Sequence, residues 1–181
     1  MSKKVLIAIA DDIEELEAVT IIDVLRRAKA DVTVASVGSK QVTASRSVKL
    51  VADVLIADCA DQVYDLIALP GGMPGAENLR DSNVLIELLK AHAKSGRFYA
   101  AICASPAVVL KYHNLLAGKK ATCYPSLISE LDNSEDAKVV VDGSCITSQG
   151  PGTALEFSLK LVEILFGKEK TEEVAQAMLA V

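Results

Sequence analysis

The residue with the clearest chemical potential is Cys103. Residues 97–102 form a short run rich in strand-forming side chains, and small residues and Pro106 follow the cysteine before an apolar segment at 107–110. This pattern predicts a strand, a sharp turn and a helix. A cysteine at such a turn lies at the carboxyl edge of a sheet and at a helix N-terminus, which favours the thiolate. The alternative is a buried thiol that packs as a small hydrophobe.

A second group with chemical potential is Glu17. Steps of four, seven and eleven residues from it along a predicted helix reach Ile21, Val24 and Ala28, which form an apolar face directed inward. A carboxyl at the head of a buried face is desolvated, so its pKa is raised and it can hold a proton near neutral pH. The alternative is a glutamate that reaches solvent at the end of the helix.

A glycine-rich turn follows another predicted buried strand. Residues 65–69 form this strand, and the turn at 70–75 includes Gly71 and Gly72. Glycines at such an edge let the backbone approach a ligand and direct its N–H groups inward, as an oxyanion site requires. The alternative is a plain Pro-Gly-Gly turn. Because no GxGxxG or P-loop pattern accompanies it, a nucleotide site is not predicted.

Buried strands and amphipathic helices alternate along the chain, which predicts an α/β fold that opens with a βαβ unit. The first helix is predicted from a cap at Asp12 to about Lys29. The expected segments are strands at 5–10, 31–37, 65–69, 97–102 and 120–125, hairpins at 41–51 and 138–148, and helices at 12–29, 82–95, 126–131, 153–166 and 168–181.

Length, charge and cysteine usage narrow the function classes. The chain has 181 residues and a net charge of -5, which predicts one domain over 1–181 and gives no electrostatic support for nucleic-acid binding. The first apolar run is too short for a signal-peptide core or a membrane span. The four cysteines are far apart, without a zinc pattern, so we expect a reduced, cytoplasmic protein without a metal or other cofactor. They are Cys59, Cys103, Cys123 and Cys145.

Three further polar residues receive simpler interpretations. His92 and His113 fall near the ends of predicted helices, and both are expected at the surface. The alternative for His92 is an inward position, since either it or Ala91 completes the core-facing side of its helix. Arg46 lies at the tip of the first hairpin, where a solvated turn residue is the simplest expectation. An oligomer contact or a contact with an anionic substrate is the alternative for Arg46.

Taken in order, four motifs resemble those of the DJ-1/ThiJ/PfpI family, and most closely its DJ-1 branch. They are Glu17 within 14–17, the glycines of 70–72, the cysteine of 100–104, and residues 147–153. The resemblance implies a flavodoxin-like three-layer sandwich with a mostly parallel sheet and a cysteine on a nucleophile elbow. It also implies a cytoplasmic homodimer.

The same resemblance assigns roles to individual residues. Cys103 is implied as the nucleophilic, oxidation-prone thiol, Glu17 as its hydrogen-bonded partner, and the backbone at Gly72 and Ala104 as the anion-holding site. The remaining implied positions are Gly71, Tyr124, Gly150 and Pro151 at the substrate site, and Arg27 and Arg46 as dimer or anion contacts.

Three positions depart from patterns in the family. Ala104 follows the cysteine where the peptidase-like branch has a histidine, which disfavours a Cys-His protease. Tyr124 stands where several relatives have histidine, and Gln149 where many have arginine. These two departures bear on substrate preference more than on the thiol chemistry.

The expected function is a cofactor-free cysteine enzyme that acts on small dicarbonyls. A glyoxalase III-type enzyme would convert methylglyoxal to lactate through a hemithioacetal on Cys103, and a deglycase would remove early glycation adducts. The alternative is an oxidative-stress sensor or chaperone that acts through a sulfinate of Cys103 without turnover. A flavodoxin-like domain with an inert thiol is the third possibility. The expected partners are a small aldehyde or glycated substrate and a second copy of the chain, with neither nucleic acid nor membrane.

Overall fold

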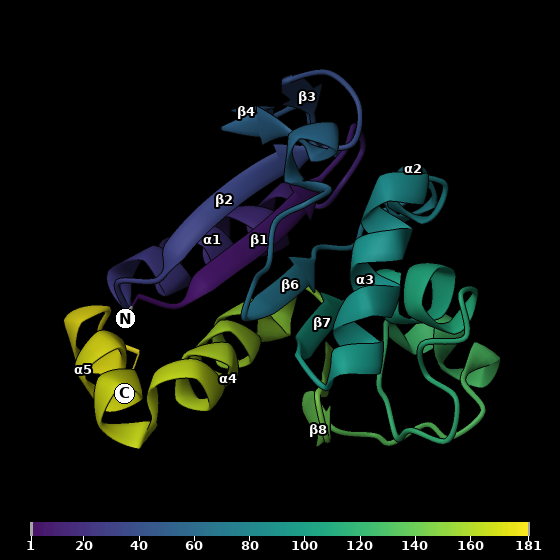
Figure 1. Cartoon of the computed structure of the whole chain (residues 1–181). Helices are drawn as coiled ribbons and strands as arrows, with labels where there is room; N and C mark the ends of the chain where they lie inside the picture. Colours follow the sequence, from purple (N-terminus) through teal and green to yellow (C-terminus); the bar gives the residue numbers. More distant parts are fainter. Residues whose placement is uncertain (1, 181) are drawn as a thin grey trace.

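A seven-stranded sheet forms the centre of the computed structural model, which describes residues 2–180 (Figure 1). Its strands are β1 (Lys4–Ile9), β2 (Asp31–Ser36), β5 (Val54–Leu55), β6 (Leu66–Leu69), β7 (Phe98–Ile102), β8 (Val139–Asp142) and β9 (Cys145–Ser148). They lie in the order β5-β2-β1-β6-β7-β9-β8, and each neighbouring pair is parallel except β8 with β9. The expected mostly parallel sheet is confirmed.

Helices cover both faces of this sheet. They are α1 (Glu15–Arg27), α2 (Gly75–Arg80), α3 (Asn83–Ser95), α4 (Ala154–Phe166) and α5 (Lys168–Ala177). Figure 1 shows α3 in front of the sheet and α1 and α4 behind it, and α1 packs directly against α4. The short turns are the 3₁₀-helices η1 (Ile56–Cys59), η3 (Pro125–Glu130) and η4 (Pro151–Thr153), and the π-helix η2 (Pro106–Lys111). The flavodoxin-like sandwich is thereby confirmed.

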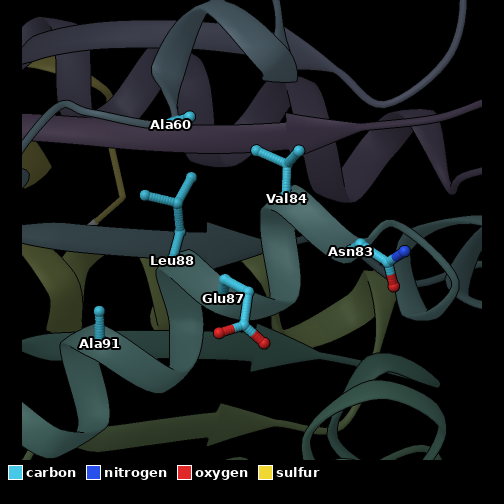
Figure 2. Close-up of a pocket in the computed structure, with 6 residues that line it drawn as sticks. All are labelled: Ala60, Asn83, Val84, Glu87, Leu88 and Ala91. Carbon is cyan, nitrogen blue, oxygen red and sulfur yellow. The ribbon is translucent and has the colours of Figure 1, made fainter.

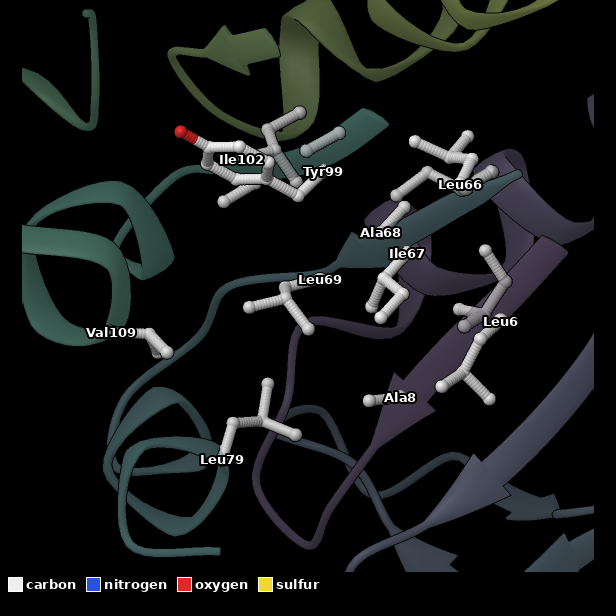
Figure 3. Packing of buried hydrophobic residues seen from close by; sticks show 14 of the residues in the cluster. Leu6, Ala8, Leu66, Ile67, Ala68, Leu69, Leu79, Tyr99, Ile102 and Val109 are labelled. Carbon is white, nitrogen blue, oxygen red and sulfur yellow. The ribbon is translucent and has the colours of Figure 1, made fainter. Parts of the chain in front are cut away.

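The central strands are buried on both faces, as their uninterrupted apolar sequences predict. Residues 5–9 and 66–69 are almost completely inaccessible to solvent. Figure 3 shows Leu69 of β6 with Leu79 of α2 and Val109 of η2 around it. Burying one such aliphatic side chain stabilises a fold by about 1.5–3 kcal/mol, so this core holds the sheet rigidly beneath the loops at its edge.

Parallel pairing brings three loops to one edge of the sheet. Ile7 of β1 lies opposite Ala68 of β6, and Leu69 of β6 lies opposite Ala101 of β7. The three strands therefore end at the same edge, and the loops that follow Ile9, Leu69 and Ile102 converge there.

The predicted first hairpin is present as β3 (Gln41–Thr43) and β4 (Lys49–Val51), which pair outside the main sheet. Hydrogen bonds attach it to the loop after β1. The Thr43 N–H donates to Asp11 Oδ1 at 2.7 Å, and the Ser45 N–H donates to the Ile13 carbonyl at 2.9 Å. The tip of the hairpin is thus held beside the start of α1.

Several local predictions are corrected. The helix α1 begins at Glu15 with Glu14 as its cap, because Asp12 adopts a φ of 63°, in the left-handed region. Residues 120–125 form an isolated bridge between Ala121 and Ser134 in place of a strand. His92 is only 3% exposed, with its Nδ1 3.1 Å from the Phe98 carbonyl oxygen, so the surface prediction for it is wrong.

The four cysteines are free thiols, as expected. Between residues 2 and 180, the helices are all too short or too polar to cross a membrane.

Candidate active site

Cys103 occupies a sharp turn directly after β7. Its φ of 64° is in the left-handed region, which costs an L-residue about 1–2 kcal/mol. Two backbone hydrogen bonds hold it there: the Cys103 N–H donates to the Ser148 carbonyl at 3.0 Å, and its own carbonyl accepts the Tyr124 N–H at 2.7 Å. The strand-turn-helix prediction is correct in outline, although the helix that follows is the π-helix η2.

The turn is packed tightly against the glycine-rich loop after β6. The hydroxyl of Ser105 donates to the Pro70 carbonyl at 2.5 Å in a fully buried contact. A Cβ on Gly71 would lie 2.5 Å from Cys103 Cβ and 2.8 Å from the Ala104 nitrogen, so only glycine fits there. The close approach of the Gly71 backbone to the turn at Cys103 explains why this position is a glycine.

Glu17 lies beneath the thiol. It is fully buried, and its Oε2 accepts the N–H of Gly71 at 2.7 Å. Its Oε1 is also buried and has no hydrogen-bond partner among the described residues. The carboxyl lies close enough to the Cys103 thiol for each group to affect the pKa of the other. The sequence prediction of a buried carboxyl is confirmed.

Burial determines the protonation of this carboxyl. It raises the pKa of Glu17 to about 7, because desolvation outweighs the stabilisation of the carboxylate by the Gly71 N–H and the Cys103 thiol, and the nearby charge of Glu14 adds to the rise. Glu17 is therefore about half ionised near neutral pH and is poised to exchange protons.

The pKa of the Cys103 thiol is raised, whereas its position at a helix N-terminus alone predicts a lowered pKa. Burial and then the negative charge of Glu17 raise the pKa of Cys103 to about 12, although the N–H groups of Gly72 and Ala104 face the sulfur and lower it. Since Glu17 loses its proton first, the resting pair is a thiol beside a partly ionised carboxyl. The carboxylate is then the base available to the thiol.

The thiol opens into a pocket of about 380 Å³. Residues from six segments of the chain line it: Glu14, Ser45, Arg46, Gly72, Met73, Cys103, Ala104, Tyr124, Ser126, Leu127 and Pro151. Cys103 itself is 8% exposed, so a small reagent reaches it only through this opening.

Most of the site residues predicted from the sequence lie in the pocket or directly behind it. Gly72, Ala104, Tyr124, Pro151 and Arg46 line the pocket beside Cys103. Two glycines support it from behind, since Gly71 backs the thiol and a Cβ on Gly150 would lie 3.3 Å from the Tyr124 ring.

Arg27 lies elsewhere, on the last turn of α1, where its Nε is 2.7 Å from Asp23 Oδ2. The side chain of Gln149 does not line the pocket and donates instead to Asp136 Oδ1 at 3.2 Å.

Three polar residues of the pocket were not predicted from the sequence: Glu14, Ser45 and Ser126. Glu14 carries the ordinary signature of an acidic residue at a helix start, and its Oε1 does accept the Leu16 N–H at 3.4 Å. Ser45 lies in a hairpin whose docking against α1 has no local sequence signal. The docking of the β3–β4 hairpin against α1 is the tertiary contact that brings Glu14 and Ser45 together at the pocket.

A different hollow lies on the outer side of α3. Its volume is about 340 Å³, and Figure 2 shows the side chains that line it. They are Ala60, Asn83, Val84, Glu87, Leu88 and Ala91. Without a thiol, or a base next to a nucleophile, this surface has no chemistry comparable with that of the Cys103 pocket.

Comparison with known proteins shows the family to which this fold and site are similar. The family model described as "DJ-1/PfpI family" matches residues 3–164. "Protein DJ-1 homolog B" of Arabidopsis thaliana is 52% identical over 179 residues, which are 97% of this chain and 41% of that protein, so the chain spans less than half of that relative.

Two other matches are covered almost completely. "Glutathione-independent glyoxalase DJR-1.2" of Caenorhabditis elegans is 37% identical over 172 residues, 93% of this chain and 91% of that protein. The solved structure titled "Toxoplasma gondii DJ-1, oxidized" has a TM-score of 0.97 and 49% identity, and the match covers 98% of both chains.

Proposed function

The chain belongs to the DJ-1/PfpI family, and on that premise we propose that it is a cofactor-free thiol enzyme that converts small dicarbonyls such as methylglyoxal into 2-hydroxy acids. One observation carries the proposal: the buried Glu17 carboxyl faces the Cys103 thiol with a pKa of about 7. A group with that pKa can both accept and return a proton at neutral pH.

The first step is addition of the thiol to the aldehyde. Glu17 takes the thiol proton while the sulfur of Cys103 bonds to the aldehyde carbon, and the carbonyl π electrons move to oxygen. The N–H groups of Gly72 and Ala104 face the sulfur, so they are the donors next to the developing oxyanion. Protonation of that oxygen by Glu17 gives the hemithioacetal.

The second step moves hydrogen from one carbon to its neighbour. The Glu17 carboxylate removes the proton on the former aldehyde carbon, which gives an enediolate with its negative charge on the second oxygen. The hydroxyl proton on the first oxygen passes to the second oxygen, and Glu17 returns its own proton to the adjacent carbon. The first carbon is oxidised to a thioester and the second is reduced to a carbinol, so the step needs no external oxidant. Water then cleaves the thioester, which releases lactate and restores the thiol.

The name of the C. elegans relative supports this reaction class. The same thiol can act on early glycation adducts by substitution: the sulfur bonds to the aldehyde-derived carbon as the C–N or C–S bond to the modified group breaks, and the released amine or thiol takes up a proton. We include this deglycase reaction in the proposed activity.

The test is lactate formation from methylglyoxal by reduced protein without added cofactor. Turnover by the wild type that Cys103→Ser abolishes supports the proposal. Cys145→Ser is the matched control, because Cys145 is a buried free thiol on β9 that does not line the pocket. Absence of turnover in the wild type, or turnover retained by Cys103→Ser, refutes the proposal.

A redox sensor is the second candidate, and the environment of the sulfur favours it specifically. A sulfinate on Cys103 would accept the N–H groups of Gly72 and Ala104 and the proton of neutral Glu17. Its formation consumes two molecules of peroxide and releases two of water. The sensor predicts that mild peroxide adds two oxygen atoms to Cys103, measured by peptide mass, and that Glu17→Gln shifts the product towards the sulfonate.

A further inference from the structure

Ser105, two positions after the nucleophile, has a fully buried hydroxyl that the catalytic pair does not use. It lies directly before η2, where a serine ordinarily accepts an N–H of the first helical turn. Among the described residues Ser105 makes no such capping bond, and its hydroxyl donates instead to the carbonyl of Pro70, 35 positions earlier in the sequence. The glycine-rich loop, and not its own helix, therefore fixes this side chain.

Ser105 and Glu17 bind the two ends of one peptide group. The Pro70 carbonyl and the Gly71 N–H belong to the same planar amide. Its oxygen accepts the Ser105 hydroxyl at 2.5 Å, and its N–H donates to Glu17 Oε2 at 2.7 Å, with both contacts buried. In such a series of hydrogen bonds each member polarises the next, so an amide whose oxygen accepts a bond becomes a stronger donor at its nitrogen.

Independent contacts hold this peptide group in place. The Gly71 carbonyl accepts the Glu14 N–H at 2.9 Å. On its other side, the position of a Cβ on Gly71 would be 2.5 Å from Cys103 Cβ and 2.8 Å from the Ile102 carbonyl oxygen, so the loop is tightly packed against the turn. Loss of the Ser105 hydroxyl should therefore weaken the Gly71 N–H as a donor while the loop keeps its position.

The ionisation of Glu17 responds to the strength of this donor. Desolvation raises the pKa of Glu17, and the Gly71 N–H is the strongest of the contacts that oppose the rise. The titratable groups that act on it are Cys103, from the turn after β7, and Glu14, at the start of α1. Arg46 lies in the wall of the pocket above the thiol, and the buried face of α4, which packs against α1, is uncharged.

We propose that Ser105 is a positioning residue that acts on Glu17 through the Pro70–Gly71 peptide, and that its hydroxyl favours the ionised form of the general base. Ser105 does not line the thiol pocket, so it acts on the chemistry only through Glu17. Its effect on the ionisation of Glu17 does not depend on the reaction that the site performs. Its effect on turnover rests on the proposed function.

Carboxyl NMR tests the proposal without turnover. The protein is labelled with glutamate that carries ¹³C in its side-chain carboxyl, and the signal that Glu17→Gln removes is assigned to Glu17. We expect Ser105→Ala to raise the pKa measured from this signal by about 0.3–0.6 pH unit, because polarisation strengthens a bond in such a series by about 10–30% and this bond stabilises a buried charge.

Ser158→Ala is the matched control. Ser158 is also fully buried, and its hydroxyl donates to the Ala154 carbonyl at 2.7 Å within α4, with no link to Glu17. Both substitutions remove a buried hydrogen bond, so both should lower the urea midpoint of unfolding, and only Ser105→Ala should change the titration of Glu17. A Glu17 titration in Ser105→Ala that coincides with the wild type, or an equal pKa rise in Ser158→Ala, overturns the proposal.

The pH profile of turnover provides the second readout. Because Glu17 has a pKa of about 7, Ser105→Ala should lower kcat/KM for methylglyoxal about two- to fourfold at about pH 6 and leave it almost unchanged at about pH 9. If the wild type shows no turnover while the carboxyl titration shifts, the proposed function fails and the role of Ser105 stands. If turnover occurs and Ser105→Ala changes neither the titration nor the pH profile, the role of Ser105 fails and the enzyme stands.

Discussion

The carboxylate of Glu17 accepts the N–H of Gly71 at 2.7 Å, although the two residues are 54 positions apart in the sequence. This bond fixes one oxygen of Glu17 and leaves the other, Oε1, buried without a hydrogen-bond partner among the described residues. It also ties α1 to the loop after β6, so the orientation of the Glu17 carboxyl depends on the same loop that packs against Cys103.

The pH dependence of turnover should report the ionisation of Glu17. As the general base it must be ionised, so kcat/KM for methylglyoxal should rise about tenfold per pH unit below a pKa of about 7 and level off above it. Glu17→Gln should lower kcat about 10²–10⁴-fold and remove this limb. The exposed Glu169→Gln on α5 is the control. A pH profile that is flat through 6–8 in the wild type would contradict the assignment.

The free energy of unfolding should fall as pH rises, in contrast to kcat/KM, which should rise. The folded state raises the pKa of Glu17 from 4.5 to about 7, so it holds a proton that the unfolded chain releases. The stabilisation is complete below pH 4.5 and is lost as pH rises through about 7. Relative to Glu17→Gln, the wild-type free energy of unfolding should fall by about 3 kcal/mol over this window. Urea unfolding of both proteins at several pH values measures this difference, and parallel curves would refute it.

Gly71→Ala should disrupt the site by steric overlap with the turn at Cys103. The added Cβ meets Cys103 Cβ at 2.5 Å and the backbone oxygen of Ile102 at 2.8 Å. Overpacking of this kind costs about 1–3 kcal/mol, and here it also displaces the thiol, so stability and Cys103 alkylation should both change. Gly152→Ala has no atom within 4 Å of the new carbon and should leave both measurements almost unchanged. Equal effects from the two substitutions would contradict this account.

The buried His92 should destabilise the protein in acid. Burial first, and the charge of Arg97, lower its pKa from 6.5, so the unfolded chain binds a proton that the folded state resists. The wild type should therefore lose stability relative to His92→Gln as pH falls below 6.5. Unfolding measurements at pH 5 and 7 on both proteins, with His113→Gln as the second-histidine control, test the sign. A constant difference between the wild type and His92→Gln would show that folding does not change the pKa of His92.

Much of the fold was accessible from sequence because its signals are local. The apolar runs of β1 and β6 are typical of strands in a sheet that is covered on both faces. The spacing from Glu17 to Ile21 and Val24 predicts that the carboxyl points inward. The tight turn at Cys103 was likewise predicted by the strand before it and the small residues around it. The sequence therefore predicts both the position of Cys103 on the turn and the inward direction of Glu17 without knowledge of any tertiary contact.

The remainder depends on contacts between distant segments. His92 lies at helical spacing from the buried Leu85 and Leu88, which allows an inward position, and the Phe98 carbonyl of β7 meets its ring there. The protonation of Cys103 was misjudged because its turn favours the thiolate while burial and the Glu17 charge, both tertiary effects, outweigh that preference. The position of Ser45 in the pocket follows from docking of the hairpin on α1.

The hairpin β3–β4 divides the site into two parts that can change independently. Cys103 and Glu17 are held by the central sheet and α1, where almost any substitution disturbs the core. Arg46 comes from a separate two-stranded unit attached at its tip by hydrogen bonds, many of them to backbone N–H groups. A change of the side chain at this tip therefore alters the wall of the pocket while the sheet and the helix that hold Cys103 and Glu17 stay as they are.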